Sequence, residues 1–461
     1  MDNRYKTLFK DAGIFAIGSF GSKVILFLLV PVYTSFMTTD EYGTADLVFT
    51  VAQLVLPVVS IVVFDAVLRF GLSKDENPEN VLLCGLLVCA IGSVAVLAIV
   101  PLIALYDAVA DWRWYLCIYV ILNMFGAVEM NYLKTKNKNH LYALFAILQT
   151  LLLAICNIIF LCVEEMGIAG YLLSTCISSL IPVICPVVFG GGMQSLKAAR
   201  FDASLMKRMC AYSAPLIVNN LSWWGIHSAD KIMVEFFWDA AVLGLFTVAT
   251  KIPALINVAI TIFGQAWGIS AVREIETTKD MAFYATVLKV LLFAAFGIAA
   301  VLIAIVKPFM AIYVGEAFEA SWQYVPLLLL SASFSAIASY CGSVYSALYK
   351  SVNGMISTLV SALVCVATGW ILIPIWGIWG AVVSLVSSYV CLALYRLIDI
   401  NRYVRIGYGG RHLIVNAILV LVEAICVSFE WFALPVSLCT LALFLLNNLD
   451  LLKRLVRRDK A

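Results

Sequence analysis

Charged residues are scarce in this chain of 461 residues. Only 13% of the residues are Asp, Glu, Lys or Arg, whereas 63% are hydrophobic and the mean hydropathy is +1.01. A water-soluble protein of this length could not cover so much apolar surface with polar side chains. The composition therefore excludes a soluble globular protein and predicts an all-α integral membrane protein.

Histidine and closely spaced cysteine are scarce as well. The three histidines, His140, His227 and His412, lie far apart, and none of the thirteen cysteines forms a Cys-x-x-Cys pair. Structural zinc sites and dithiol redox centres need such close spacings. We therefore expect no metal and no cofactor, and we expect the cysteines to be reduced and buried in apolar helices.

Apolar windows of about 20 residues, the length that spans a bilayer, recur along the whole chain. The first is too long for the core of a signal peptide and no cleavage site follows it, so we interpret it as a retained helix. Fourteen windows are predicted as transmembrane helices: 12–36, 44–68, 81–105, 113–133, 141–163, 168–189, 211–236, 243–268, 282–310, 323–348, 354–375, 378–397, 411–429 and 431–449.

The distribution of positive charge supports this helix count. With the N-terminus placed in the cytoplasm, 24 of the 30 Lys and Arg residues fall in cytoplasmic segments, and a single one, Arg113, falls in an outer loop. Cytoplasmic loops carry the excess of Lys and Arg, and a wrong helix count would destroy the alternation. The sequence thus predicts that both termini are cytoplasmic.

An internal repeat divides the chain. The motif Gly-Ile-x-Gly opens two predicted helices, at residues 167–170 and 377–380, and a weaker similarity joins residues 41–51 with 242–252. The offsets are 210 and 201 residues, and an even number of helices per copy makes the two copies parallel. The predicted domains are an N-terminal lobe over 1–192, a basic interfacial linker over 193–208, a C-terminal lobe over 209–398, and two added helices with a basic cytoplasmic tail over 399–461.

Charged side chains inside the seventh helix form a candidate site. A charge within a spanning helix costs about 2.5–3.5 kcal/mol on insertion scales, so each one needs a reason. Asn220, His227, Lys231 and Glu235 share one face at helical spacing, and Asp230 flanks that face. A polar cavity, an anchor at the interface or a pair between Lys231 and Glu235 would each explain this pattern.

Other predicted helices carry similar groups. Lys251 and Asn257 lie on a stripe of small and polar residues, and Asp46 and Gln53 lie on another, although such stripes also serve helix packing. Lys23 lies deep in the first helix. We expect these side chains to line a cavity between the two lobes.

Two further charges are isolated. Lys289 lies about a third of the way along its helix, and Glu423 lies in the middle of the thirteenth helix, as a counter-ion for a cavity lysine or as a protonatable group. Because the deep charges are mostly lysines, the cavity would suit an anionic ligand with sugars or phosphates. The residues predicted to bind substrate are Lys23, Lys251, Lys231, Lys289, Asn220, His227, Gln53 and Asn257, and those predicted to pair charges or couple transport are Asp230, Glu423 and Asp46.

Four short motifs carry a family resemblance: Asp-Glu-Tyr-Gly at 40–43 before the second helix, Ala-Asp-Lys at 229–231, Gly244, and Gly-Ile-x-Gly at 377–380. Together they resemble the polysaccharide transporter (oligosaccharide flippase) family of the multidrug/oligosaccharidyl-lipid/polysaccharide exporter superfamily. The resemblance covers essentially the full length. It implies two lobes in a V shape that move undecaprenyl-pyrophosphate-linked oligosaccharides across the bacterial inner membrane by alternating access.

The resemblance also implies partners and relatives. Lipid-linked oligosaccharide, membrane lipid, a polysaccharide polymerase and other envelope-assembly proteins are expected partners; nucleic acid is not, and a monomer is expected. A lipid II flippase, with cationic residues on its first and eighth helices where Lys23 and Lys251 stand here, and a drug/cation antiporter remain alternatives. An enzyme such as a membrane glycosyltransferase is disfavoured, because the predicted outer loops are short.

Overall fold

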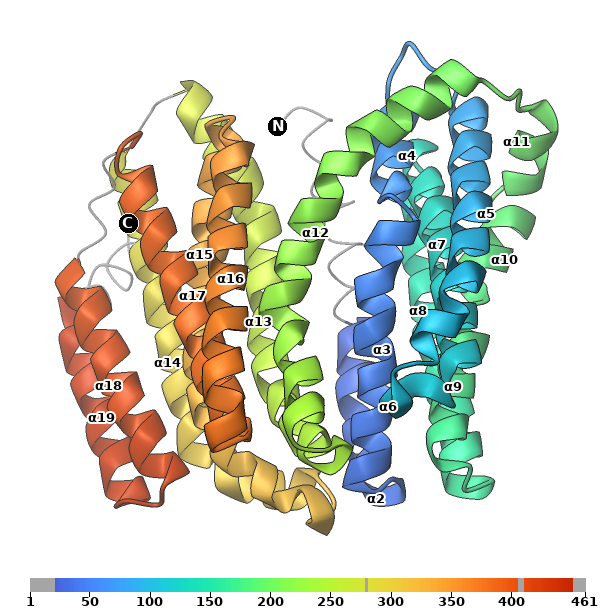
Figure 1. Cartoon of the computed structure of the whole chain (residues 1–461). Coiled ribbons are helices and arrows are strands. Elements are labelled where there is room, and N and C mark those ends of the chain that lie inside the picture. Colours follow the sequence, from blue (N-terminus) through green and yellow to red (C-terminus); the bar gives the residue numbers. More distant parts are fainter. Residues whose placement is uncertain (1–20, 278–280, 405–409, 451–461) are drawn as a thin grey trace. The chain divides into compact units, whose positions relative to one another are not determined.

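The fold, given by a computed structural model, consists of long helices joined by short turns (Figure 1). The structure describes residues 21–277, 281–404 and 410–450, and these ranges contain no β-strand. Within them, eleven helices are long and apolar enough to cross a membrane, and Gly21–Phe36 and Ala433–Asn447 are shorter apolar helices. With α12 (Ala203–Phe237), every predicted span has a helical counterpart. Residues 12–20 of the first span and the tail from residue 451 lie outside the described ranges.

The chain forms two compact units, Met1–Trp224 and Gly225–Ala461, and α12 contributes to both. The other elements of the first unit are α2 (Val30–Phe36), α3 (Thr39–Val59), α4 (Val63–Gly71), α5 (Pro78–Ile103), α6 (Asp107–Ala110), α7 (Arg113–Thr135), α8 (Asn139–Asn157), the π-helix η1 (Ile158–Val163), α9 (Gly167–Ser178), α10 (Ile181–Val188) and α11 (Gly192–Ala198). Those of the second are α13 (Ala240–Thr277), α14 (Met281–Tyr313), the 3-10 helix η2 (Glu316–Tyr324), α15 (Val325–Ala347), α16 (Ser351–Trp376), α17 (Ile378–Ile400), α18 (Gly410–Ser428) and α19 (Ala433–Asn447).

Each unit is organised around a central helix. In the first unit, α7 packs against α3, α4, α5 and α10, and in the second, α15 packs against α13, α14, α17 and α18. Buried residues lie on every side of α15. A helix that is apolar all round is expected in the interior of a bundle. These two helices occupy equivalent places in the two halves.

The helix starts confirm the parallel repeat. Helix α3 begins at Thr39 and α13 begins at Ala240, an offset of 240 − 39 = 201 residues. Gly167 and Gly377, the first residues of the two Gly-Ile-x-Gly motifs, adopt φ values of +54° and +55° at the starts of α9 and α17. Positive φ is accessible to glycine at little cost. The all-α fold with two six-helix repeats is therefore confirmed.

Residues 40–43 correct one boundary. They were predicted as a turn before the second helix but form the first turn of α3, because Thr38 and Glu41 form a capping box. The Thr38 backbone N–H donates to Glu41 Oε2 at 2.9 Å, and the Glu41 N–H donates to Thr38 Oγ1 at 3.2 Å. Reciprocal caps of this kind satisfy N–H groups that the first turn leaves open.

Two predicted spans are broken helices. The predicted helix 44–68 consists of α3 and α4, separated where Ile61 and Val62 adopt left-handed φ values of 50° and 54°. The hydroxyl of Ser60 accepts from the Val62 N–H at 3.2 Å, which satisfies a donor that the break frees. The predicted helix 168–189 likewise consists of α9 and α10.

The backbone at Gly377 yields a stability prediction. Its φ of 55° and ψ of −127° suit only glycine, and a Cβ atom there would lie 3.3 Å from the Trp238 ring. We expect Gly377→Ala to destabilise the protein by about 1–3 kcal/mol. Thermal unfolding in detergent should show a lower midpoint.

The matched control is Gly354→Ala. Gly354 lies inside α16, where an added Cβ atom would meet Tyr345 at 3.7 Å, an ordinary contact. Because alanine is favoured over glycine inside a helix by about 0.5–1 kcal/mol, this variant should be unchanged or slightly more stable. Equal loss of stability in both variants would contradict the assignment of strain to Gly377.

Candidate functional site

Asp230 lies at the centre of a buried polar cluster in the second unit. Its side chain is 2% exposed. The Ser384 hydroxyl of α17 donates to Oδ1 at 3.0 Å, and the Cys365 thiol of α16 lies 3.5 Å from Oδ2. Helix α16 can approach closely because Gly369 faces Asp230, where a Cβ atom would lie 3.0 Å from Oδ1. Helices α16 and α17 thus each place one donor at the carboxyl group that α12 carries.

His227 extends this cluster by one turn of α12. Its Nδ1 atom lies 2.9 Å from the hydroxyl of Tyr389 on α17. Lys231, next to Asp230 and half-buried, is close enough to His227 for their charges to interact. The structure therefore brings together three residues that the sequence singled out. A carboxyl group, an imidazole and an ammonium group on one helix face can hold a cation or proton, or bind a polar ligand.

The stripe on α12 meets the stripe on α3 at one point in the first unit. The indole Nε1 of Trp224 donates to the backbone oxygen of Thr50 at 3.0 Å. Gln53, one turn further along α3, is exposed, while Asn220 is half-buried and donates to the carbonyl oxygen of Leu216 at 3.0 Å. At this contact the polar face of α12 lies against the backbone of α3.

Asp46 belongs to a second cluster, in the first unit. It is 8% exposed and lies close enough to Tyr171 of α9 for a charge interaction. The ring of Tyr171 packs edge-on against Tyr33 at a centroid distance of 4.9 Å, and the Tyr33 hydroxyl accepts from Asn157 Nδ2 at 3.2 Å. Asn157 is fully buried, and its Oδ1 atom has no partner among the described residues. The Asp46 carboxyl group thus lies beside a cluster of aromatic rings.

The remaining predicted residues are dispersed. Lys23 is exposed and forms no hydrogen bond or ion pair with the described part of the chain. Lys251, Asn257 and Lys289 are half-buried, and Lys251 takes part in at least one polar interaction. Glu423 is fully buried on α18. Their predicted roles in substrate binding and coupling stay predictions.

Sequence reasoning missed the partners of these groups. Ser384 and Cys365, which bond to Asp230, stand 154 and 135 residues after it, and Tyr389 stands 162 residues after His227. A local signal existed for one of them: Ser384 and Ser388 are one helical turn apart on α17, directly after the repeated glycine motif.

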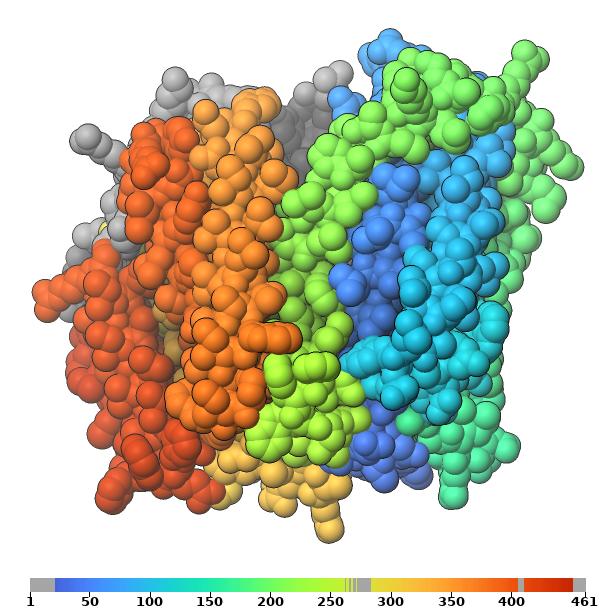
Figure 2. Space-filling view, viewed as in Figure 1, coloured from blue at the N-terminus to red at the C-terminus, as the bar shows by residue number. Residues whose placement is uncertain are grey.

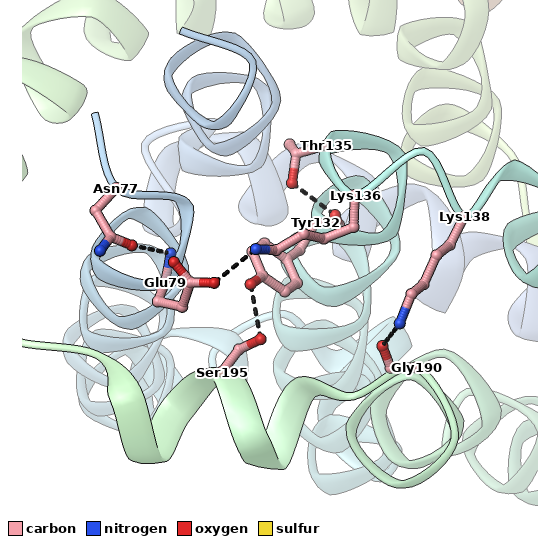
Figure 3. A network of polar contacts seen from close by, with 8 residues as sticks. All are labelled: Asn77, Glu79, Tyr132, Thr135, Lys136, Lys138, Gly190 and Ser195. Carbon is pink, nitrogen blue, oxygen red and sulfur yellow. Dashed lines mark hydrogen bonds and ion pairs between the residues drawn. The ribbon is translucent and has the colours of Figure 1, made fainter. Parts of the chain in front are cut away.

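Several cations hold the first unit together at one end (Figure 3). Lys136 Nζ lies 2.6 Å from Glu79 Oε1 at the start of α5, and Lys138 Nζ donates to the Gly190 carbonyl oxygen at 2.7 Å. The Tyr132 hydroxyl bonds to Ser195 Oγ of α11 at 2.8 Å. Burial of the Lys136 ammonium group lowers its pKa, but the contacts with Glu79 and Tyr132 together raise the pKa overall. These lysines serve structure.

The start of α12 is fastened in the same way. Arg208 lies 2.6 Å from Glu76, and the Arg200 N–H donates to Asn80 Oδ1 at 2.7 Å. Figure 2 shows this part of α12, in green, lying against the blue end of α5. Residues 193–208 therefore hold α11 and the first turns of α12, tied to the α4–α5 end by polar contacts.

Comparison with known proteins places this multi-pass membrane fold in a family. A family model described as polysaccharide biosynthesis protein matches residues 32–323, more than half of the chain. The chain therefore belongs to the polysaccharide biosynthesis protein family, as its sequence motifs predicted. Lsg locus putative protein 1 of Haemophilus influenzae is 20% identical over 262 residues, which are 56% of this chain and 64% of that protein, less than two thirds of its length.

Solved structures share the fold. The lipid II flippase MurJ in an inward closed conformation superposes with a TM-score of 0.71 at 14% identity, covering 97% of this chain and all 100% of that one. A transporter of the MOP superfamily from Pyrococcus furiosus gives 0.62 at 14% identity, over 85% and 96% of the two chains. A single-residue mutant of the Vibrio cholerae MATE transporter VcmN gives 0.58 at 15% identity, over 87% and 97%.

The Asp230 cluster can be tested by a double-mutant cycle. Asp230→Asn and Ser384→Ala each remove one side of the same contact, so we expect their effects on unfolding to be coupled by about 0.5–3 kcal/mol. Chemical or thermal unfolding of the two single variants and the double variant measures the coupling.

Ser174→Ala is the control for that cycle. Its hydroxyl is also buried and donates to the Gly170 carbonyl oxygen at 2.8 Å, on α9 of the first unit and away from Asp230. Its effect should add to that of Asp230→Asn. Additivity for Ser384→Ala as well would show that the Ser384 hydroxyl does not hold the carboxyl group.

Proposed function

We propose that this protein is a flippase that moves an undecaprenyl-pyrophosphate-linked oligosaccharide, such as an O-antigen, capsule or exopolysaccharide repeat unit, from the inner to the outer leaflet. The observation that carries the proposal is the family match over residues 32–323, on a chain with eleven described helices that are long and apolar enough to span a membrane. Such a substrate joins a long apolar chain to an anionic head group with sugars. A protein that moves it needs polar groups inside an apolar bundle, and both units hold such groups.

Lysines would contact the pyrophosphate. A ligand would reach the ammonium groups of four lysines that are exposed or half-buried: Lys23, Lys251, Lys231 and Lys289. Keeping such charges within a bilayer costs free energy. Ammonium groups form strong, charge-assisted hydrogen bonds to phosphate oxygens. Pairing with an anionic head group would offset the cost of keeping these charges within the bilayer.

Polar neutral groups would contact the sugars. Asn220, His227, Gln53 and Asn257 combine amide and imidazole groups, which both donate and accept hydrogen bonds. His227 and Gln53 are exposed, and Asn220 and Asn257 are half-buried, so a ligand would reach these side chains. Asp46 and Asp230 are buried, and their carboxyl groups would couple transport by pairing with positive charge.

Alternating access would move the head group. The two compact units of the chain would rock so that the site opens first to the cytoplasm and then outward, while the prenyl chain stays in lipid. We place the protein in the bacterial inner membrane as a monomer with cytoplasmic termini, acting as a transporter beside the polymerase and other envelope-assembly proteins.

The first functional prediction concerns two lysines. Lys23→Ala and Lys251→Ala should each reduce transport about 10-fold or more, because a hydrogen bond to a charged group is worth about 1.5–3 kcal/mol. Deletion of the protein should cause lipid-linked sugar to accumulate in the inner leaflet. The measurement is the fraction of labelled lipid-linked sugar accessible from each side of membrane vesicles.

Two controls sharpen this test. Lys74→Ala removes an exposed cation from the turn before α5 and should leave transport unchanged. Lys251→Arg keeps the charge and should retain most of it. Unchanged transport in both alanine variants at normal expression would remove the cationic site, and accumulation of lipid II in place of an oligosaccharide would assign the alternative substrate.

The second functional prediction concerns the driving force. Export of an anion from a negative interior is favoured by about 2.3 kcal/mol per charge per 100 mV. Outward transport should therefore accelerate when vesicles carry an inside-negative potential and slow when it is collapsed. A rate independent of the imposed potential would exclude net movement of negative charge.

A further inference from the structure

Glu423 is a buried acid whose carboxyl oxygens lack a hydrogen bond of normal geometry within the described part of the chain. It lies in the middle of α18, it is 0% exposed, and neither carboxyl oxygen has a hydrogen-bond partner among the described residues. Ser437 of α19 faces the carboxyl group without forming a hydrogen bond of normal geometry. Asp230, by contrast, is buried with two donors.

The α18–α19 hairpin carries a polar stripe along its inner face. Asn447 and Asn448 donate to Asn416 Oδ1 at 2.9 and 3.1 Å, which fixes the register of the two antiparallel helices. In this register Glu423 lies opposite residue 441, directly after Thr440 and one helical turn from Ser437, and both of these side chains are buried. The hairpin lies beside α14 and α15 (Figure 1).

The register against α14 shows how far the nearest cations lie. Lys307 Nζ contacts Glu430 Oε1 at 2.5 Å, and Phe444, which stands opposite Val420, packs against Gly297. Both contacts give an offset of 123 residues between α14 and α18. Glu423 therefore lies level with Ala300, about 10 Å from Lys307 along the axis.

Lys289 lies further away still. In the same register it is level with His412, about 16 Å along the axis from Glu423. The titratable groups on the elements packed against α18 are Lys289, Lys307, Tyr284 and Tyr313 on α14; Tyr340, Cys341 and Tyr345 on α15; Cys439 on α19; Glu316, Glu319 and Tyr324 on η2; and Arg411, His412 and Cys426 on α18 itself.

None of these groups can hold Glu423 as an anion. Lys307 is committed to Glu430, and the charged residues of η2 are exposed acids. Helix α15 and helix α19 carry no Lys or Arg. A carboxylate buried without a partner costs so much free energy that the group takes up a proton instead. Of the two roles open from the sequence, this geometry disfavours the counter-ion.

We propose that Glu423 is a proton-binding site, and that release of its proton is linked to separation of the α18–α19 hairpin from α14 and α15. The acid loses its proton to water only when water reaches it, because the carboxylate needs hydration. The O–H bond breaks, water accepts the proton, and the negative charge stays on Glu423. The opened hairpin is therefore favoured at high pH and the packed hairpin at low pH. This inference rests on the proposed function only for its use in transport.

Infrared difference spectroscopy of the full-length protein in lipid nanodiscs tests the proton. The wild type at neutral pH should show the carbonyl stretch of a protonated carboxylic acid that lacks a hydrogen bond, and Glu423→Gln should lose this band. Glu129→Gln is the matched control: Glu129 is also buried, with an unpartnered Oε2, but lies in the first unit. It should keep the Glu423 band.

Hydrogen exchange read by mass spectrometry tests the linkage. Amides of α18 and α19 should exchange faster at alkaline pH than the intrinsic rate predicts, and Glu423→Gln should abolish this extra dependence. If that variant does not fold, Glu423→Asp should keep the pH dependence and shift the infrared band. An ionised Glu423 at neutral pH, or equal pH dependence in wild type and Glu423→Gln, would overturn the proposal. Neither readout needs the lipid-linked sugar, so failure of the substrate assignment would be distinguishable.

Discussion

The absence of water inside a bilayer constrains every polar group in this protein. Helices form hydrogen bonds between their own backbone groups, but each buried polar side chain needs a hydrogen-bond partner in the protein. A buried ionisable side chain without such a partner becomes neutral. Asp230 meets this constraint with donors from two other helices, and Asn157 meets it in part through Tyr33. Polar groups with protein partners therefore serve the structure, whereas a buried polar group without one needs a ligand or a proton.

Most of the fold was predictable because the bilayer imposes this constraint on the sequence directly. Every predicted span has a helical counterpart, and the glycine motifs marked equivalent helix starts in both halves. The breaks at Ile61–Val62 and between α9 and α10 were missed because each lies inside a window apolar enough for one span, although serine precedes both breaks and Pro182 follows the second. The start of α3 was missed by a few residues because its capping box comprises polar residues that resemble a loop.

The candidate site was predictable only in part. Helical spacing correctly grouped His227, Asp230 and Lys231, because residues three and four apart share a face. Their partners Ser384 and Tyr389 come from another helix more than 150 residues away, and no local pattern encodes that pairing. A single sequence therefore indicates which helix face is polar, whereas the packing of helices decides what that face binds.

In the α18–α19 hairpin, Glu423 does not meet this constraint through the described residues. It lies outside the two repeats, so the duplicated fold does not require its polar stripe. Asparagine side chains at one end form hydrogen bonds across the hairpin, whereas the acid near the middle has no hydrogen-bond donor of normal geometry among the described residues. A leucine at that position would bury apolar surface at no desolvation cost. Glu423 weakens the packing of the hairpin compared with a leucine. Its presence is explained if its ionisation changes that packing. The hairpin then couples the proton to motion within the second unit.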